Sequence, residues 1–237
     1  MRRPELPLAR AGSRAPGESY AAGARWARPR TVGSVSGYYD LEPRRRERPR
    51  WQVAALCSGG FVGVLWLLEF LDHLMANRLD ASGIQPGSTD GLMGVLFAPL
   101  LHGGYGHLMA NTGPLLVLGF LVALAGISKW IAVTVTVWLV GGVGTWLTGG
   151  LGTLHIGASG LVFGWLVYLV VRGFVSRNPW QIALGVVIFL VYGSILWGVI
   201  PGTPGVSWQG HLFGALGGAL AAVALDRPPR RRAFEVY

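Results

Sequence analysis

The sequence contains few charged side chains for its length. Only 13% of its 237 residues are Asp, Glu, Lys or Arg, against about 25% in ordinary soluble domains. Between residues 53 and 225 just eight such side chains remain. Because a soluble domain of that size still exposes about 30% of its chain surface to water, this deficit argues against a soluble enzyme.

Cysteine is almost missing as well. Cys57 stands alone in an apolar run, so the chain has neither a disulfide framework nor a cysteine pair for a metal. No HisGluXaaXaaHis or other metal spacing occurs, and we expect no metal and no organic cofactor. The N-terminus also lacks the continuous apolar stretch of a signal peptide, so the chain itself must supply any membrane anchor.

The positive charge is concentrated at one end of the chain. The formal net charge is +9, but 12 of the 19 Arg precede Trp51. A nucleic-acid partner would need Lys and Arg distributed over a folded face, and the remaining chain is nearly neutral, so no nucleic-acid partner is expected. Arg outnumbers Lys 19 to 1, which hints at a GC-rich bacterial genome.

Composition divides the chain into three parts. Residues 1–50 are rich in Arg, Pro, Gly and Ser, which is typical of a disordered segment. The basic cluster at 44–50 can attract anionic lipid by about 1 kcal/mol per charge, or it can be a solvated charge run that only sets topology. We expect a disordered basic cytoplasmic tail at 1–50, a membrane domain at 51–226 and a short basic cytoplasmic tail at 227–237.

Apolar runs of about 20 residues, the length that spans a bilayer, follow one another through the middle part. They predict an all-α membrane protein with six transmembrane helices at 53–72, 107–125, 130–148, 157–172, 180–200 and 207–225. A further apolar stretch at 91–101 is too short to span and contains Pro99. We interpret it as an interfacial or re-entrant element.

Loop charges predict the orientation. Lys129, Arg172 and Arg177 lie in turns on the same side as the two basic tails, whereas the opposite loops contain only Arg78. Because short cytoplasmic loops carry an excess of Lys and Arg, both termini should be cytoplasmic. The second, fourth and sixth helices should then begin at the outer face.

Four polar side chains fall where a membrane helix should be apolar. His107 and Asn111 lie in the second helix, Ser159 at the start of the fourth and His211 in the sixth, all within the first turns after the outer face. Such residues mark a functional site by default. Taken singly, however, each can also serve interhelical hydrogen bonding, packing or a bond to its own backbone.

Glycine spacing predicts that the fourth and sixth helices touch. Gly160 and Gly164 match a stripe at Gly210, Gly214 and Gly218, and small residues at this spacing let helices approach closely. That contact would bring the His211 imidazole beside the Ser159 hydroxyl. The other outer histidines, His73 and His155, we interpret as interfacial side chains without a ligand.

Three motifs, and the order in which they occur along the chain, resemble those of the rhomboid family of intramembrane serine proteases. They are HisGlyGlyTyrGlyHisLeuMetAlaAsn at 102–111, GlyAlaSerGly at 157–160 and GlyHisLeuPheGlyAlaLeuGlyGly at 210–218. The resemblance covers the six-helix region. It is specific because all three motifs are present and follow one another in this order. One departure is the lack of the Trp-Arg pair that some members carry in the first outer loop.

The resemblance implies a role for each residue. Ser159 would be the nucleophile and His211 the general base of a dyad without a carboxylate. His107 and Asn111 would stabilise the oxyanion, together with backbone N–H groups near Ser159. Phe163 would stack on the histidine, and His102 would hold the outer loop.

The expected function is therefore a serine endopeptidase that cleaves transmembrane segments through an acyl-enzyme. Its partners would be transmembrane substrates and the lipid bilayer, most naturally in a bacterial plasma membrane. Two alternatives stay open. One is a non-catalytic rhomboid-like protein that binds membrane helices for quality control, which would normally have lost Ser159 or His211. The other is a small transporter with broken helices, although no inverted repeat is visible.

Overall fold

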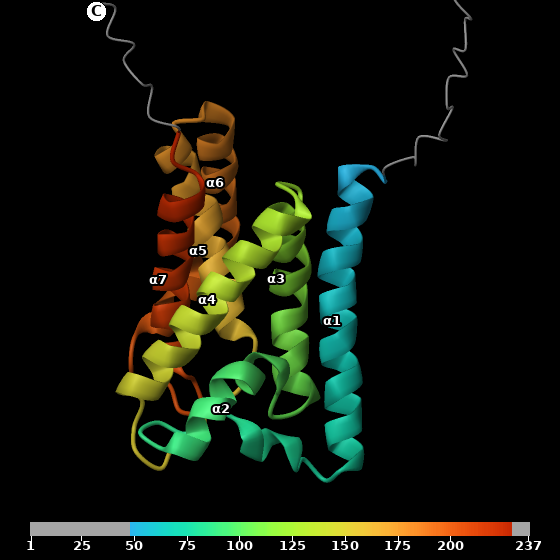
Figure 1. Ribbon diagram of the computed structural model, residues 1–237, viewed down its shortest axis with the longest axis vertical. Helices are drawn as coiled ribbons and strands as arrows, with labels where there is room; N and C mark the ends of the chain where they lie inside the picture. The colour runs from blue at the N-terminus through green and yellow to red at the C-terminus, as the bar shows by residue number, and fades with distance from the viewer. Residues whose placement is uncertain (1–47, 229–237) are drawn as a thin grey trace, which may run out of the picture. The chain divides into compact units, whose positions relative to one another are not determined.

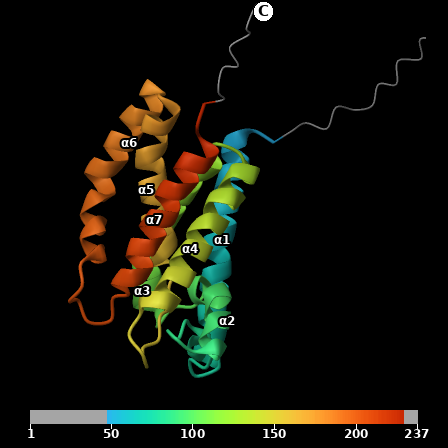
Figure 2. The same ribbon diagram turned by 60° about the vertical axis from the view of Figure 1, so that its left-hand side comes forward.

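The computed structural model describes residues 48–228, which form an all-helical unit (Figures 1 and 2). Its α-helices are α1 (Arg50–Leu74), α2 (Thr89–Phe97), α3 (Tyr105–Ala123), α4 (Ile127–Thr148), α5 (Ser159–Ser176), α6 (Pro179–Tyr192) and α7 (Trp208–Leu225). Short 3-10 helices are η1 (Leu79–Ser82), η2 (Ala98–Leu100) and η3 (Gly193–Val199). The predicted tails at 1–50 and 227–237 lie outside the described residues except for 48–50 and 227–228.

Six helices are long and apolar enough to cross a membrane, which confirms the predicted all-α six-span architecture. Five are single α-helices, and the sixth span joins α6 to η3 over Pro179–Val199. Each predicted run overlaps one span, and their ends differ by at most four residues, as at the end of α5 (172 predicted, 176 observed). Hydropathy locates these helices well because bilayer thickness fixes their length.

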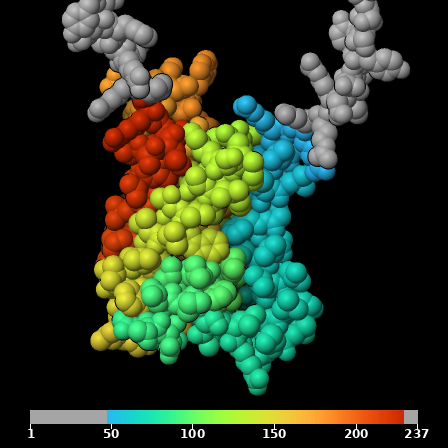
Figure 3. Space-filling model, viewed as in Figure 1, coloured from blue at the N-terminus to red at the C-terminus, as the bar shows by residue number. Residues whose placement is uncertain are grey.

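The short apolar stretch between the first two spans forms α2 and η2 rather than a spanning helix. Ser88 caps α2, and its hydroxyl accepts a hydrogen bond from the N–H of Gly91. The indole of Trp138 on α4 donates to the carbonyl of Val95 at 2.8 Å. The element therefore lies against α4 at one end of the bundle (Figures 1 and 3).

Interior packing centres on α5. α1 packs mainly on α3, while α5 contacts α3, α4, α6 and α7. Fully buried Leu65, Leu115 and Trp165 belong to the main core. Indole N–H groups also bond between helices, as from Trp66 to the Thr112 hydroxyl at 3.0 Å. The helix that begins at Ser159 is therefore the one that the other helices surround.

Glycines bring α5 and α7 into direct backbone contact. A Cβ added to Gly214 would collide with the carbonyl oxygen of Gly160, and one added to Gly218 with that of Gly164. A Cβ on Gly160 would itself lie 3.2 Å from the carbonyl oxygen of Gly210. The predicted contact between these two helices is therefore confirmed.

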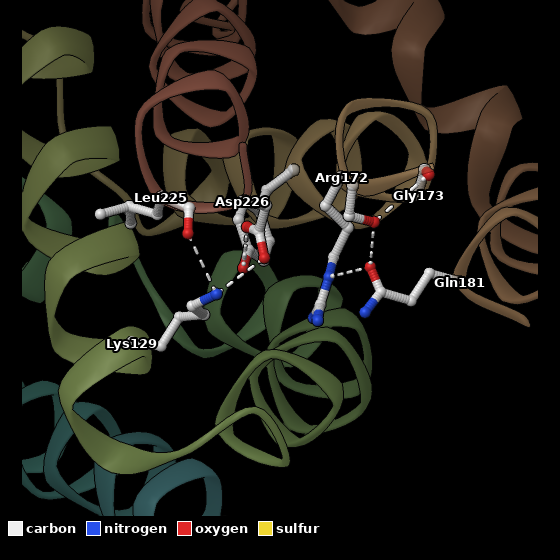
Figure 4. Close-up of polar contacts among 8 residues, drawn as sticks. Lys129, Arg172, Gly173, Gln181, Leu225 and Asp226 are labelled. Atoms are coloured by element: carbon white, nitrogen blue, oxygen red, sulfur yellow. Dashed lines mark hydrogen bonds and ion pairs between the residues drawn. The ribbon is translucent and has the colours of Figure 1, made fainter. Parts of the chain in front are cut away.

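A polar network joins the helices at the end of the bundle where α1 begins and α7 ends (Figure 4). The Lys129 ammonium pairs with Asp226 at 2.7 Å and donates to the carbonyl of Leu225 at 3.3 Å. The other carboxylate oxygen of Asp226 accepts from the Tyr168 hydroxyl at 2.8 Å. One carboxylate therefore connects α4, α5 and the end of α7.

A second group at this end joins α5 to α6. The Gln181 side-chain oxygen accepts hydrogen bonds from Arg172 Nε at 3.3 Å and from the Ser176 hydroxyl at 2.9 Å (Figure 4). Asn178 caps α6 just before Pro179, and its side chain accepts from the N–H groups of the first turn. These contacts fix the turn between the two helices.

Basic side chains gather at this same end. Of the seven Lys and Arg among the described residues, six lie there and only Arg78 lies at the opposite end. The six are Arg48, Arg50, Lys129, Arg172, Arg177 and Arg227. We name this the basic end, and the opposite end, where α5 and α7 begin, the site end.

Candidate active site

Ser159 and His211 meet at the site end. Ser159 is the first residue of α5, and His211 is the fourth residue of α7. The two atoms Ser159 Oγ and His211 Nε2 lie 2.8 Å apart, within hydrogen-bond range. The glycine contact between the helices explains how residues 52 positions apart come so close.

The His211 ring is oriented without a carboxylate. Its Nδ1 lies 2.9 Å from the carbonyl oxygen of Gly198 in η3. A carbonyl can only accept, so Nδ1 carries the proton and donates, and Nε2 of the neutral ring is left to accept from the Ser159 hydroxyl. The Phe163 ring stacks on the imidazole, with centroids 4.0 Å apart and planes within 8°.

A cavity of about 720 Å³ opens beside this pair. Ser159 and His211 line it together with His107 and Asn111 from α3. Asn111 is buried, and its side-chain amide donates to the carbonyl of His107 at 3.2 Å. The structure thus brings together all four polar residues that the sequence placed in one layer.

The backbone before Ser159 presses against His107. Gly157 has φ +118°, a conformation that favours glycine, and an added Cβ would lie 2.6 Å from Cε1 of His107. The Gly157 N–H donates to the carbonyl of Ala98 at 2.8 Å. Glycine at this position lets the imidazole of α3 approach the start of α5.

His102 holds the same loop, and its ring contacts that of His107 with the centroids 5.1 Å apart. Its ring is almost fully buried, and Nε2 accepts a hydrogen bond from the N–H of Ala158 at 3.3 Å. Burial, with a smaller effect of the neighbouring His107, lowers the pKa of His102 to about 4. The ring is therefore neutral at pH 7, as an accepting nitrogen requires.

Ser159 also lines a smaller cavity of about 40 Å³. Its lining is mostly apolar or glycine, with Val137, Gly141 and Thr145 from α4 facing Gly160 and Leu161 from α5. That volume exceeds what one water needs. It also suits a small side chain.

Sequence reasoning gives no role at the site to three residues near the dyad, Gly198, His155 and Ser207, and it interprets His155 only as an interfacial side chain. Gly198 acts through its carbonyl, which every residue possesses, so no sequence signal marks it. His155 Nδ1 lies 2.7 Å from the Ser207 hydroxyl, and burial lowers the pKa of His155. For His155 and Ser207 the sequence offers one sign of a shared role, their spacing: each precedes one member of the dyad by four positions.

Comparison with known proteins finds a matching family and similar sequences. The family model described as the Rhomboid domain matches residues 89–228, which include α2 through α7. An uncharacterized protein of Mycobacterium tuberculosis strain H37Rv is 52% identical over 193 residues, covering 78% of this chain and 80% of that protein. An uncharacterized protein of Mycobacterium leprae is 44% identical over 201 residues, covering 81% and 80%.

The family match extends over more than half of the chain and contains all three motif regions. It also contains the five spans from α3 to α7, among them the three helices α3, α5 and α7 that line the large cavity. The protein is a member of the rhomboid family.

Proposed function

We propose that this protein is an intramembrane serine endopeptidase that works through a Ser159–His211 dyad and an acyl-enzyme. The observation that carries the proposal is the 2.8 Å contact between the Ser159 hydroxyl and His211 Nε2 at the wall of the large cavity. A serine hydroxyl is a weak nucleophile until a base within hydrogen-bond reach accepts its proton. His211 meets this requirement of distance and of tautomer.

Ser159 Oγ and His211 Nε2 both act in each of the two proposed steps, acylation and deacylation. Ser159 Oγ attacks the scissile carbonyl while its proton moves to His211 Nε2, and the tetrahedral intermediate then expels the amine, which takes that proton. A water molecule next attacks the ester carbonyl, with His211 again accepting a proton and returning it to Ser159. The cavity beside the dyad provides room for this water.

His107 and Asn111 are proposed to donate hydrogen bonds to the oxyanion. Their side chains line the same cavity as Ser159. The N–H groups of Leu161 and Val162 already donate to the carbonyl of Ala158, so the N–H groups of Ser159 and Gly160, at the very start of α5, are the ones that can add to them. Losing one such donor costs about 2.7–4 kcal/mol of transition-state stabilisation in a soluble serine protease.

Phe163 is proposed to orient the histidine. In a triad a carboxylate fixes the imidazole, whereas here the stacked Phe163 ring and the Gly198 carbonyl occupy its two free sides. The role of the phenyl ring is to prevent the imidazole from rotating away from Ser159.

The proposed substrates are transmembrane segments of other membrane proteins. An intact helix hides its carbonyls in its own hydrogen bonds, so the substrate must unwind locally at the dyad. Small or helix-breaking residues near the cut should be preferred. The cavity of about 40 Å³ beside Ser159 supports this preference, because it limits the side chain that fits.

We propose a bacterial plasma membrane as the location, with both termini cytoplasmic. The six basic side chains at the basic end support this orientation through the positive-inside rule. The mycobacterial relatives support a bacterial setting. Contact of the 1–50 tail with anionic lipid is also proposed, although nearly all of that tail lies outside the described residues.

The test is cleavage of a model transmembrane substrate in liposomes by the wild type, Ser159→Ala and His211→Ala. Both variants should lose cleavage, and a fluorophosphonate probe should label the wild type but not Ser159→Ala. If either variant cuts as fast as wild type, the dyad assignment is wrong. A wild type that neither cuts nor labels would instead support a non-catalytic rhomboid that binds membrane helices.

A further inference from the structure

We propose that His155 is a positioning residue whose hydrogen bond to Ser207 fixes the axial register of α5 and α7 and so aligns the dyad. This inference rests on the proposed function, because the dyad is what it positions. The same link also has a purely structural consequence that can be measured without turnover. His155 itself does not touch the reacting atoms.

The two pairs of residues run in parallel. His155 precedes Ser159 by four residues, and Ser207 precedes His211 by four. His155 Nδ1 lies 2.7 Å from Ser207 Oγ, and Ser159 Oγ lies 2.8 Å from His211 Nε2. The segments leading into α5 and α7 are thus joined at two successive levels.

Neighbouring groups determine the direction of the hydrogen bonds at His155. The Thr153 hydroxyl donates to the carbonyl of Gly150 at 2.6 Å and lies 2.7 Å from His155 Nε2. Because its one proton is committed, Thr153 must accept from Nε2–H. Nδ1 of the neutral ring then accepts from the Ser207 hydroxyl, whose oxygen stays free to cap the N–H of Gly210.

Both ends of the link are fixed to backbone. The N–H and carbonyl of His155 pair with the carbonyl and N–H of Ile84 at 3.0 and 2.9 Å. Ser207 is the N-cap of α7, and its carbonyl accepts from the N–H of His211 at 3.1 Å. A displacement of Ser207 therefore shifts the peptide that carries the catalytic imidazole.

Glycine packing alone does not prevent α5 and α7 from sliding along each other. The contacts at Gly160, Gly164 and Gly214 set how closely α5 and α7 approach. Smooth glycine surfaces resist sliding of one helix along the other much less than interlocking side chains would. The His155–Ser207 link supplies a directional restraint at the level where the dyad needs it, since misplacement by about 1 Å can cost 100-fold in rate.

Two amide substitutions separate the hydrogen bonds of the ring. In His155→Asn the side-chain oxygen can take the place of Nδ1 and keep the bond to Ser207. In His155→Gln the longer amide can keep the bond to Thr153 and lose the one to Ser207. His73→Gln is the matched control, because His73 is exposed at the same end of the bundle and lines neither cavity.

Steady-state cleavage of a transmembrane substrate is the first measurement. His155→Gln should lower kcat about tenfold with KM unchanged within about twofold, because alignment acts on the chemical step. His155→Asn should stay within about threefold of wild type, and His73→Gln should match it. Equal kcat for His155→Gln and wild type, in an enzyme that Ser159→Ala inactivates, would overturn the proposal.

The second measurement is the ¹⁵N NMR signal of His211 Nε2 in detergent micelles, which reports its hydrogen bond to Ser159 without turnover. His155→Gln should move this signal toward the value in Ser159→Ala, and His155→Asn should not. An unchanged signal in His155→Gln refutes the positioning role even if the wild type proves inactive. Failure of the wild type to cleave or label, by contrast, bears only on the proposed function.

Discussion

Replacing Gly214 with alanine should disable the dyad while leaving the fold in place. The new methyl would meet the carbonyl oxygen of Gly160, which belongs to helix backbone and cannot rotate aside. Restoring ordinary contact requires α5 and α7 to separate by about 1 Å at this level. Gly214 lies three residues from His211, so the separation carries directly to the dyad.

The size of the effect follows from that shift. The distance of 2.8 Å between Ser159 Oγ and His211 Nε2 would grow to about 3.8 Å, which is beyond hydrogen-bond range. We expect cleavage at least about 100-fold slower than wild type. Overpacking should cost the fold about 1–3 kcal/mol, which a six-helix bundle can tolerate.

Two further alanine variants make the test quantitative. Gly218→Ala places a methyl against the carbonyl oxygen of Gly164, one turn farther from the dyad. It should destabilise the fold as Gly214→Ala does, but slow cleavage only about tenfold because the helices open less at His211. Gly113→Ala is the control, since its Cβ meets nothing within 4 Å and alanine favours the helix by up to about 1 kcal/mol.

The assay combines cleavage rates in liposomes with thermal unfolding in detergent for the three variants. The loss of activity should be smaller for Gly218→Ala, which lies farther from the dyad, than for Gly214→Ala, while the loss of stability should be equal for the two variants. Wild-type cleavage by Gly214→Ala would refute this reasoning. So would equal rate losses for the two destabilised variants.

Three other predictions concern separate parts of the molecule. Phe163→Leu should remove a stack worth about 0.5–1.5 kcal/mol and lower kcat about tenfold, whereas Phe174→Leu, exposed on the same helix, should not change steady-state kinetics. Asp226→Asn should break the ion pair with Lys129 at the basic end (Figure 4) and lower unfolding stability by about 1–3 kcal/mol, with cleavage retained. Burial and neighbouring carboxylates raise the pKa of Asp80 from 3.8 to about 6, so its stabilising contribution is complete below pH 3.8 and declines as pH rises through 6. Stability measured across that range should slope downward in wild type and less steeply in Asp80→Asn.

Much of the fold could be predicted because the bilayer imposes simple rules. Apolar length locates the six spans, and Pro99 together with a short apolar run marks the non-spanning α2 region. Spans that alternate in direction place the starts of α3, α5 and α7 at one end, which is why His107, Ser159 and His211 could be grouped from sequence. Small residues at matching spacing then predicted that α5 and α7 are in contact.

The missing parts of the site depend on geometry that no residue type encodes. Gly198 contributes a carbonyl, and only the path of η3 determines that it faces His211. His155 and Ser207 are common polar residues whose contact spans 52 positions. Their contact becomes evident only in the folded chain, where the loop before α5 lies beside the N-cap of α7.

Orientation of His211, the proposed base, by neutral groups has an energetic rationale and a consequence. A buried carboxylate would have to lose its hydration, whereas the Gly198 carbonyl and the Phe163 ring bring no charge into the bundle. The carbonyl belongs to η3, however, which continues from α6, a helix whose only buried residues are Gly185 and Ile188. Because α6 is held by so few buried side chains, a displacement of η3 would release Nδ1 and free the ring to turn. The competence of His211 is therefore tied to the position of the least buried span.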